Sequence, residues 1–222
     1  MRTALLLSAA VLIAGAVSAD EEVTHPFSKS ISRDGIKRVI VDVPAGEVRL
    51  RNSSGDRIAI SGESRREYDG HRERAKEQRI VDDIGAEIFT NGDEALIRRS
   101  YGPNAQSWSA RSWHSNYRIT VEVPRGMDVD IETRYGELSI EGDFGNLNAD
   151  LRAGEIHVRM PRDSVHELNA SVRIGEVHTD FGMDREDHEG ILPGSTHFIN
   201  AGGRSRINLH TTVGELHVTL TH

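Results

Sequence analysis

The sequence predicts a mostly β protein, built as a short β-solenoid or β-helix-like stack of 18–21-residue coils with one inserted helix and hairpin. A twelve-residue pattern recurs in register, which is typical of stacked repeats. Each copy alternates apolar and polar residues and carries a Gly-Glu pair at the same place. The clear copies are Val129–Ile140, Leu147–Val158, Leu168–Thr179 and Ile207–Val218, and a looser copy is Val39–Leu50.

The alternation within each copy predicts a strand with one buried face. In Leu147–Val158 the apolar residues keep one parity up to Gly154 and the opposite parity after it. A glycine at such a shift indicates a bulge or sharp corner with positive φ. The same shift occurs at Gly136, Gly175 and Gly214, and also at Gly46. The predicted buried residues are Leu151, Ile156, Val172, Val177, Leu209 and Leu216.

The spacing of the glycines sets the length of a coil. It is 18 residues from Gly136 to Gly154, 21 to Gly175 and 39 to Gly214. The long last gap contains an insertion at residues 181–204, either a loop or a degenerate coil, with Thr196–Ile199 as its one strand. No copy can bury its apolar face alone, so the stacked copies are expected to share one core.

These patterns predict a single β-repeat domain over residues 36–222, preceded by an N-terminal extension at 20–35. A second insertion, at 63–116, departs from the repeat. Its charge pattern predicts a helix from about residue 70 to 84. A hairpin is predicted over Ala86–Tyr101, because Asn91-Gly92 is a strong turn dipeptide, and a loop follows it. We expect this insertion to cover one end of the stack, which would otherwise expose a strand edge.

Residues 1–19 have the pattern of a secretory signal peptide. Arg2 supplies the positive charge, Ala4–Val17 is apolar, and Val17-Ser18-Ala19 is a cleavage pattern that would leave Asp20 first. The alternative is a retained membrane anchor, but the apolar run is short beside the roughly 20 residues that a spanning helix needs. The sequence therefore predicts export, to the periplasm or to the cell surface and beyond.

Charge and cysteine content exclude some classes of partner. Removing residues 1–19 removes Arg2 and no acidic residue, so 26 basic side chains face 35 acidic ones, a net charge of −9. An acidic chain does not suit nucleic acid or an anionic lipid surface. The chain has no cysteine, so no disulfide framework stabilises it. No segment of the mature chain is apolar enough over sufficient length to span a membrane.

The repeats resemble a known group of bacterial proteins. A strand that ends in VEVPRG, followed by VDIETRYGELSIEG and by further Gly-Glu strands, is similar to the "putative-adhesin" family of exported β-strand-repeat domains of unknown function. The resemblance covers about residues 36–220 and is weakest over 63–115. It implies an exported protein with a β-solenoid-like fold, without catalytic residues or cofactors. The family has no agreed functional site to transfer.

Two groups of residues are candidate sites. Stacking places equivalent residues of neighbouring coils about 4.8 Å apart, so Glu155, His157, Glu176 and His178 are predicted to share one patch. Such a mixture suits Zn²⁺ or a similar divalent ion. The alternative is an ordinary solvated surface. A second group could form an aromatic platform for a glycan or peptide, or could instead cover the end of the core: it consists of Tyr101, Trp108, Trp113 and Tyr117.

Recognised catalytic motifs are missing from the sequence. It contains no G-x-S-x-G, no H-E-x-x-H and no phosphate-binding G-x-x-x-x-G-K-[ST]. The leading prediction is therefore a non-enzymatic envelope or extracellular module that acts by surface contact or scaffolding. The first alternative is a protein that binds a divalent metal or a glycan. The second is a hydrolase or lyase of envelope polysaccharide.

Overall fold

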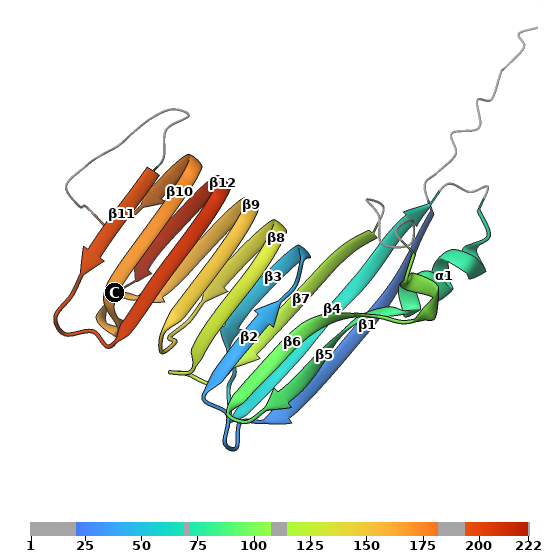
Figure 1. Cartoon of the computed structure of the whole chain (residues 1–222), viewed down its shortest axis with the longest axis horizontal. Coiled ribbons are helices and arrows are strands. Elements are labelled where there is room, and N and C mark those ends of the chain that lie inside the picture. The colour runs from blue at the N-terminus through green and yellow to red at the C-terminus, as the bar shows by residue number, and fades with distance from the viewer. Residues whose placement is uncertain (1–20, 69–71, 108–114, 182–193, 222) are drawn as a thin grey trace, which may run out of the picture.

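The computed structural model describes residues 21–68, 72–107, 115–181 and 194–221, and it is mostly β, as predicted (Figure 1). Within these described residues, twelve strands form one sheet. In chain order the elements are β1 (Glu21–Ser32), β2 (Arg38–Asp42), β3 (Ala45–Asn52), β4 (Arg57–Tyr68), α1 (Arg74–Asp82), β5 (Ile84–Asn91), β6 (Glu94–Tyr101), η1 (Pro103–Ala105), β7 (Ser115–Val123), β8 (Asp128–Glu141), β9 (Leu147–Pro161), η2 (Arg162–Ser164), β10 (Val165–Thr179), β11 (Gly194–Ile199) and β12 (Ser205–Thr221).

The repeat copies pair in parallel and in register, as the sequence predicts. The glycines of β3, β8, β9, β12 and β10 stand opposite one another in one column, in the order Gly46, Gly136, Gly154, Gly214 and Gly175. The order in space differs from the order in the chain, because β12 lies between β9 and β10. The reason is that β11 pairs with the outer edge of β10, so the last repeat joins the inner edge.

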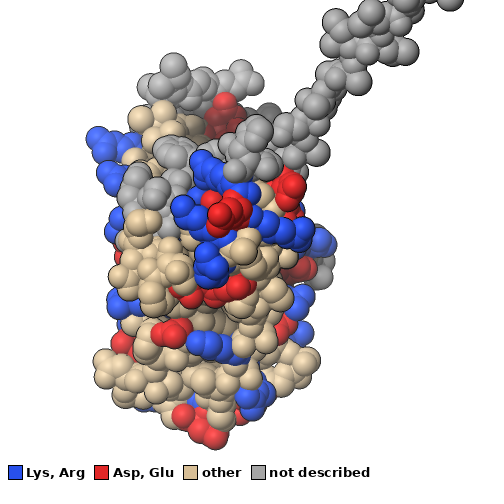
Figure 2. All heavy atoms as spheres, turned by 90° about the vertical axis from the view of Figure 1, so that its right-hand side faces the viewer, with Lys and Arg blue, Asp and Glu red and all other residues tan. Residues whose placement is uncertain are grey.

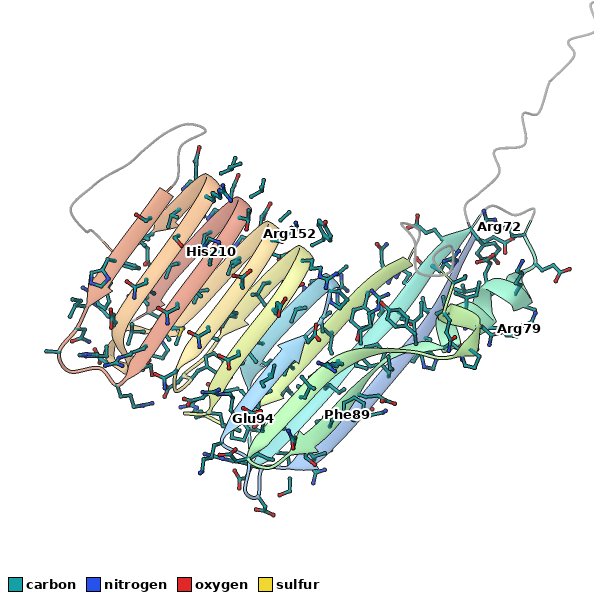
Figure 3. The ribbon with its side chains drawn as sticks, viewed as in Figure 1. Arg72, Arg79, Phe89, Glu94, Arg152 and His210 are labelled. Carbon is teal, nitrogen blue, oxygen red and sulfur yellow. The ribbon has the colours of Figure 1, made fainter. Side chains whose placement is uncertain are left out.

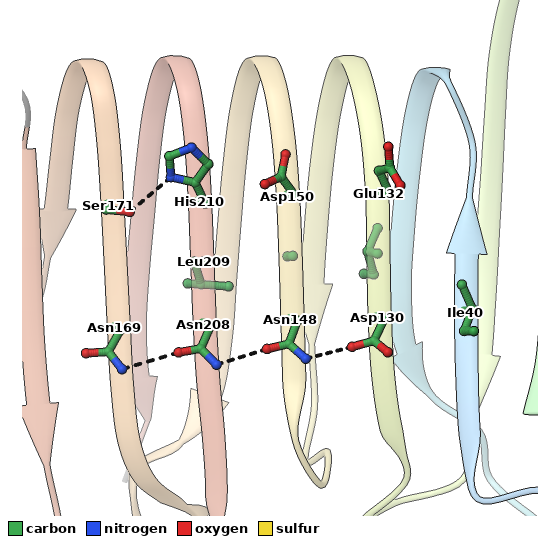
Figure 4. Close-up of a pocket in the computed structure, with 12 residues that line it drawn as sticks. Ile40, Asp130, Glu132, Asn148, Asp150, Asn169, Ser171, Asn208, Leu209 and His210 are labelled. Atoms are coloured by element: carbon green, nitrogen blue, oxygen red, sulfur yellow. Dashed lines mark hydrogen bonds between the residues drawn. The ribbon is translucent and has the colours of Figure 1, made fainter.

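Each long repeat strand bends at its glycine, and Figure 4 shows these bends as arches. Gly154 has φ of +137° and Gly175 has φ of +139°, which confirms the predicted positive φ. A Cβ on Gly154 would collide with the carbonyl oxygen of Gly136 on the neighbouring strand. Glycine is therefore required both by its own backbone conformation and by the close approach of the next strand.

The bend folds the sheet into two layers around one core. One layer runs β5, β6, β2, β8, β9, β12, β10 and β11, and the other runs β1, β4, β7, β3, β8, β9, β12 and β10. Both halves of a bent strand point apolar residues inward, such as Leu151 and Ile156 of β9, which are fully buried. Val172, Leu209 and Leu216 are also buried as predicted, whereas Val177 is half-buried. The sheet is open, from β1 at one edge to β11 at the other.

The end of the sheet opposite β11 is built by the first half of the chain (Figure 1). Residues 20–35, predicted as an N-terminal extension, contain β1, which pairs antiparallel with β4. This strand does not show the repeat pattern, because it is an edge strand rich in polar residues. It also contains Pro26, which edge strands tolerate. Viewed from this end, acidic and basic side chains are interspersed (Figure 2), which discourages pairing with another edge.

The predicted inserted helix and hairpin are both present. Helix α1 lies within the predicted range of 70–84 and packs against β1 and β4. Strands β5 and β6 form the hairpin, with Gly92 at φ of +61° in its turn. Strand β4 continues to Tyr68, beyond the predicted start of the insertion at residue 63. Among the described residues, no helix has the length and apolar character needed to cross a membrane.

Candidate functional site

The two layers expose two outward faces over the repeat strands. The amide-ladder face consists of the outward side chains before the bending glycines, and the Glu–His face consists of those after them. Because the buried residues of both halves enter one core, the two faces point away from that core on opposite sides. In-register stacking turns every outward position into a column of side chains about 4.8 Å apart.

The amide-ladder face is named after a continuous row of hydrogen bonds (Figure 4). Asn148 Nδ2 donates to Asp130 Oδ1 at 2.6 Å, and Asn208 Nδ2 donates to Asn148 Oδ1 at 2.9 Å. Asn169 Nδ2 donates to Asn208 Oδ1 at 3.2 Å, and His197 Nδ1 lies 2.6 Å from Asn169 Oδ1. Each ladder bond uses one amide N–H and one oxygen lone pair, so Asn148 and Asn208 keep a second N–H and a second lone pair for a ligand. Asn169 Nδ2 also donates to Glu167 Oε1 at 3.3 Å.

A shallow depression of about 390 Å³ lies beside this ladder. Its other side is a second column, in which Glu132, Asp150, His210 and Ser171 stand in register. His210 Nδ1 lies 3.1 Å from Ser171 Oγ, and Figure 4 shows the two columns along the strands. The depression is therefore lined by oriented amides, by carboxylates and by one imidazole.

The amide column continues into apolar side chains on the neighbouring strands. Ile40 of β2 stands opposite Asp130 and also lines the depression. Leu96 of β6 follows, and then Phe89 of β5, whose ring is 49% exposed (Figure 3). A polar ladder thus passes into an apolar strip on the same face, an arrangement that suits a ligand with both hydroxyl groups and C–H surfaces.

The Glu–His face carries two adjacent columns. The first column, in spatial order, contains Glu47, Glu137, Glu155, Glu215 and Glu176. The second contains Arg49, Ser139, His157, His217 and His178. Like charges that stand opposite one another on neighbouring strands repel and destabilise the sheet. A positively charged group bound beside the glutamate column would therefore reduce this repulsion.

Within the described residues, the arginine ion pairs of the glutamate column are at its Glu47 end. Glu47 Oε2 accepts a hydrogen bond from Arg118 Nε at 2.6 Å, and Arg49 Nη2 lies 2.5 Å from its Oε1. Burial raises the pKa of Glu47, but the hydrogen bond and charge of Arg118, together with Arg49, outweigh it and leave that pKa below its ordinary value. Further along the column, Glu155, Glu215 and Glu176 each contact a histidine.

Three imidazoles stack face to face along this surface. The ring centroids of His157 and His217 are 4.7 Å apart, and those of His217 and His178 are 4.6 Å apart. Each Nε2 contacts the glutamate of its own strand, at 3.1 Å for Glu155, 3.2 Å for Glu215 and 3.4 Å for Glu176. The side chains are 36–56% exposed, so solvent reaches all of them.

The expectation that His157 and His178 are direct neighbours is wrong. Because β12 lies between β9 and β10, His217 separates the two histidines and Glu215 separates Glu155 from Glu176. The four predicted residues do share one face, but its centre is Glu215 and His217. The copy Ile207–Val218 has the same Gly-Glu-x-His spacing, which already indicates in the sequence that Glu215 and His217 belong to this face.

The predicted aromatic platform is only partly described. Tyr117 is buried: its ring stacks on Phe27 at 5.5 Å, and its hydroxyl donates to the Gly85 carbonyl oxygen at 3.2 Å. Burial strongly raises the pKa of the Tyr117 hydroxyl. The Arg99 guanidinium lies 4.3 Å from the centre of the Tyr117 ring and 5.1 Å from that of the half-buried Tyr101. Tyr117 therefore belongs to the core and does not face solvent.

Other predicted features lie outside the described residues. These are Trp108 and Trp113 of the aromatic group and the signal peptide at 1–19. The described part of the insertion 181–204 contains β11, Gly194–Ile199, which includes the predicted strand Thr196–Ile199.

No protein-family model matches the chain, and no match is found among curated proteins. Among solved structures, the chain is similar to a "putative cell adhesion protein" from Clostridium sporogenes, with 8% identity, a TM-score of 0.49, and coverage of 90% of this chain and 100% of that one. It is also similar to a "putative adhesin" from Parabacteroides merdae, with 8% identity, a TM-score of 0.23, and coverage of 87% and 95%. A "putative lipid binding protein" from Parabacteroides distasonis has 8% identity and a TM-score of 0.25, with coverage of 87% and 96%.

Solved structures named adhesins are thus among the neighbours of this chain, as the resemblance of the repeats predicts. Their TM-scores are all below 0.5, so they carry no argument about its activity or its ligand.

Proposed function

We propose that this chain is an exported, non-enzymatic surface-contact module that holds a hydroxyl-rich glycan of the cell envelope against its amide-ladder face. The observation that supports this most is the hydrogen-bonded row from Asp130 through Asn148, Asn208 and Asn169 beside the depression. In this proposal the bent strands act as a short solenoid, a rigid scaffold that presents the row.

The chemistry of the face fits sugar hydroxyl groups. A hydroxyl group can donate to a carboxylate such as Asp150 and accept from an amide N–H such as that of Asn148. Because the ladder bonds already fix each amide, little conformational entropy is lost when a ligand binds. The apolar strip that starts at Ile40 can take the C–H face of a sugar ring.

The repetition of the face fits a repeating ligand. A polymer chain that lies across the strands meets equivalent groups on β8, β9, β12 and β10. Each contact is weak, but linked contacts gain from high effective concentration. The depression is shallow, which favours holding a chain along the surface over enclosing a single small molecule.

The test is binding of the mature chain, residues 20–222, to insoluble peptidoglycan and to soluble neutral and acidic polysaccharides. We expect saturable binding to at least one of them, weakened about tenfold or more by the double variant Asn148→Ala with Asn208→Ala, equivalent to about 1.4 kcal/mol. The matched control is Arg159→Gln, an exposed change on the opposite face. No binding to any preparation, or equal binding by the double variant, would refute the proposal.

The same preparations test the enzymatic alternative. Incubation with the protein should release no new reducing ends and no unsaturated products. Release of either would support the hydrolase or lyase reading instead. Export is tested separately, by N-terminal sequencing of protein recovered from the envelope, which should begin at Asp20.

A further inference from the structure

We propose a second site, on the Glu–His face: His178, Glu215 and His217 bind one divalent transition-metal ion of the Zn²⁺ class. This goes beyond the proposed function and does not depend on it, because the metal site and the amide ladder lie on opposite sides of the core. The site joins the last two strands of the stack on that face, β10 and β12.

The geometry of the three side chains is close to that of a metal site. One ligand atom from each of His178, Glu215 and His217 can be chosen so that all three lie within 4.8 Å of one another. In a tetrahedral zinc site the ligand atoms are about 3.3 Å apart, since the bonds are about 2.0–2.2 Å long. Small rotations of three solvent-exposed side chains span the difference. Two imidazoles, a carboxylate and an open fourth position form a known type of zinc ligand set.

The charge of the face favours a cation at this place. Glu215 stands in register between Glu155 and Glu176, so three carboxylates lie in a row. The ion pairs that the structure gives for these three carboxylates are with histidines. A divalent ion bound to Glu215 would offset the repulsion along the row.

The position of His178 explains why this trio is favoured over the equivalent one around His157. Strand β11 pairs with β10 only along Glu167–Val172, before the bend. Within the described residues, the half of β10 that carries His178 therefore has β12 as its only strand neighbour. His157 in contrast lies between Ser139 and His217. Among the described residues, the group whose ligand atoms all lie within 4.8 Å of one another contains His178 and does not contain His157.

The test is titration of the tag-free mature chain with Zn²⁺ by calorimetry, with Mg²⁺ and Ca²⁺ for comparison. We expect one Zn²⁺ per chain and much weaker heats for the other two ions, which prefer oxygen ligands. His178→Gln and His217→Gln should each weaken Zn²⁺ binding at least tenfold. His157→Gln is the matched control, with the same column and the same Glu contact, and should change it less than threefold.

A second readout uses Co²⁺, whose visible absorption reports a low-coordinate site containing imidazole. That absorption should appear with the unchanged chain and with His157→Gln, and disappear with His178→Gln. Because these side chains are exposed, circular dichroism should show the same fold in all variants. Zn²⁺ binding no tighter than Mg²⁺ binding, or an equal loss with His157→Gln, would overturn the assignment. Glycan binding should not change with His178→Gln, which keeps this test separate from that of the proposed function.

Discussion

At the scale of single residues, the bends depend on glycine more than on any apolar side chain. Five glycines form one column, and each of the last four would direct a Cβ at a carbonyl oxygen of the neighbouring glycine. A side chain at any one of these positions would therefore disturb the neighbouring strand as well as its own strand.

Gly154→Ala is expected to destabilise the fold by about 2–4 kcal/mol, since it adds backbone strain at φ of +137° and a collision with Gly136. The matched control is Gly55→Ala, where a Cβ meets nothing within 4 Å. Denaturant unfolding monitored by circular dichroism measures both. Equal stability of the two variants would contradict the role given to the glycine column.

Neighbouring residues on one strand should differ sharply in their contribution to stability. Leu151 is fully buried, so Leu151→Ala should cost about 2–5 kcal/mol of unfolding free energy. Asp150 is exposed, and Asp150→Ala should cost less than about 0.5 kcal/mol. The comparison of urea midpoints checks the inward and outward assignment, which equal losses would disprove.

Glu47 should give the fold a dependence on pH. Its pKa in the folded state is lowered, so its stabilising effect is complete above its ordinary pKa of 4.5 and is lost as pH falls through the folded value. Near pH 7, Glu47→Gln should cost about 1–2 kcal/mol, because it removes the charged partner of Arg118. The difference between the two proteins should narrow below pH 4.5 in thermal melts, and a constant difference down to pH 3 would exclude this explanation.

At the scale of elements, the parts with a regular pattern could be predicted and the irregular ones could not. The bent strands, the hairpin and α1 follow from alternation, from Asn91-Gly92 and from the charge pattern. Strand β1 was not predicted, because its buried or partly buried apolar residues Val23, Phe27 and Ile31 are four positions apart and mainly polar residues occupy the positions between them. The histidine neighbours on the Glu–His face were missed for a different reason: strand order depends on where β11 docks, and no local pattern encodes that.

Helix α1 is attached to the sheet by a buried ion pair. Arg66 Nε of β4 donates to Glu77 Oε2 at 2.6 Å, and both side chains are 4% exposed. Glu77→Gln should cost about 3–5 kcal/mol of unfolding free energy, since it removes one charge from a buried ion pair. Lys76→Gln, one residue away and exposed, should have little effect. Chemical unfolding followed by circular dichroism measures the stability of the two variants. Similar stabilities would show that the Arg66–Glu77 ion pair contributes little.

At the scale of the whole molecule, the last strand of the chain lies inside the sheet. β12 pairs with β9 on one side and with β10 on the other. Within the described residues, the hairpin of β10 and β11 therefore joins the rest of the sheet through its pairing with β12. Such long-range parallel pairing is expected to form late and to make folding slow.

A chain that ends at Gly203 should therefore lose the β10 end of the sheet. The amides of Ile174–Thr179 should exchange with deuterium as in an unfolded peptide, because β12 is their only strand neighbour within the described residues. The amides of β4 and β7 should stay protected, since their partners lie in the first half of the sheet. A chain that lacks only Thr221 and His222 is the control and should retain protection throughout. Protected amides at Ile174–Thr179 of the shorter chain would mean that β10 can pair with β9 directly, and that β12 is not what sets the order of the strands.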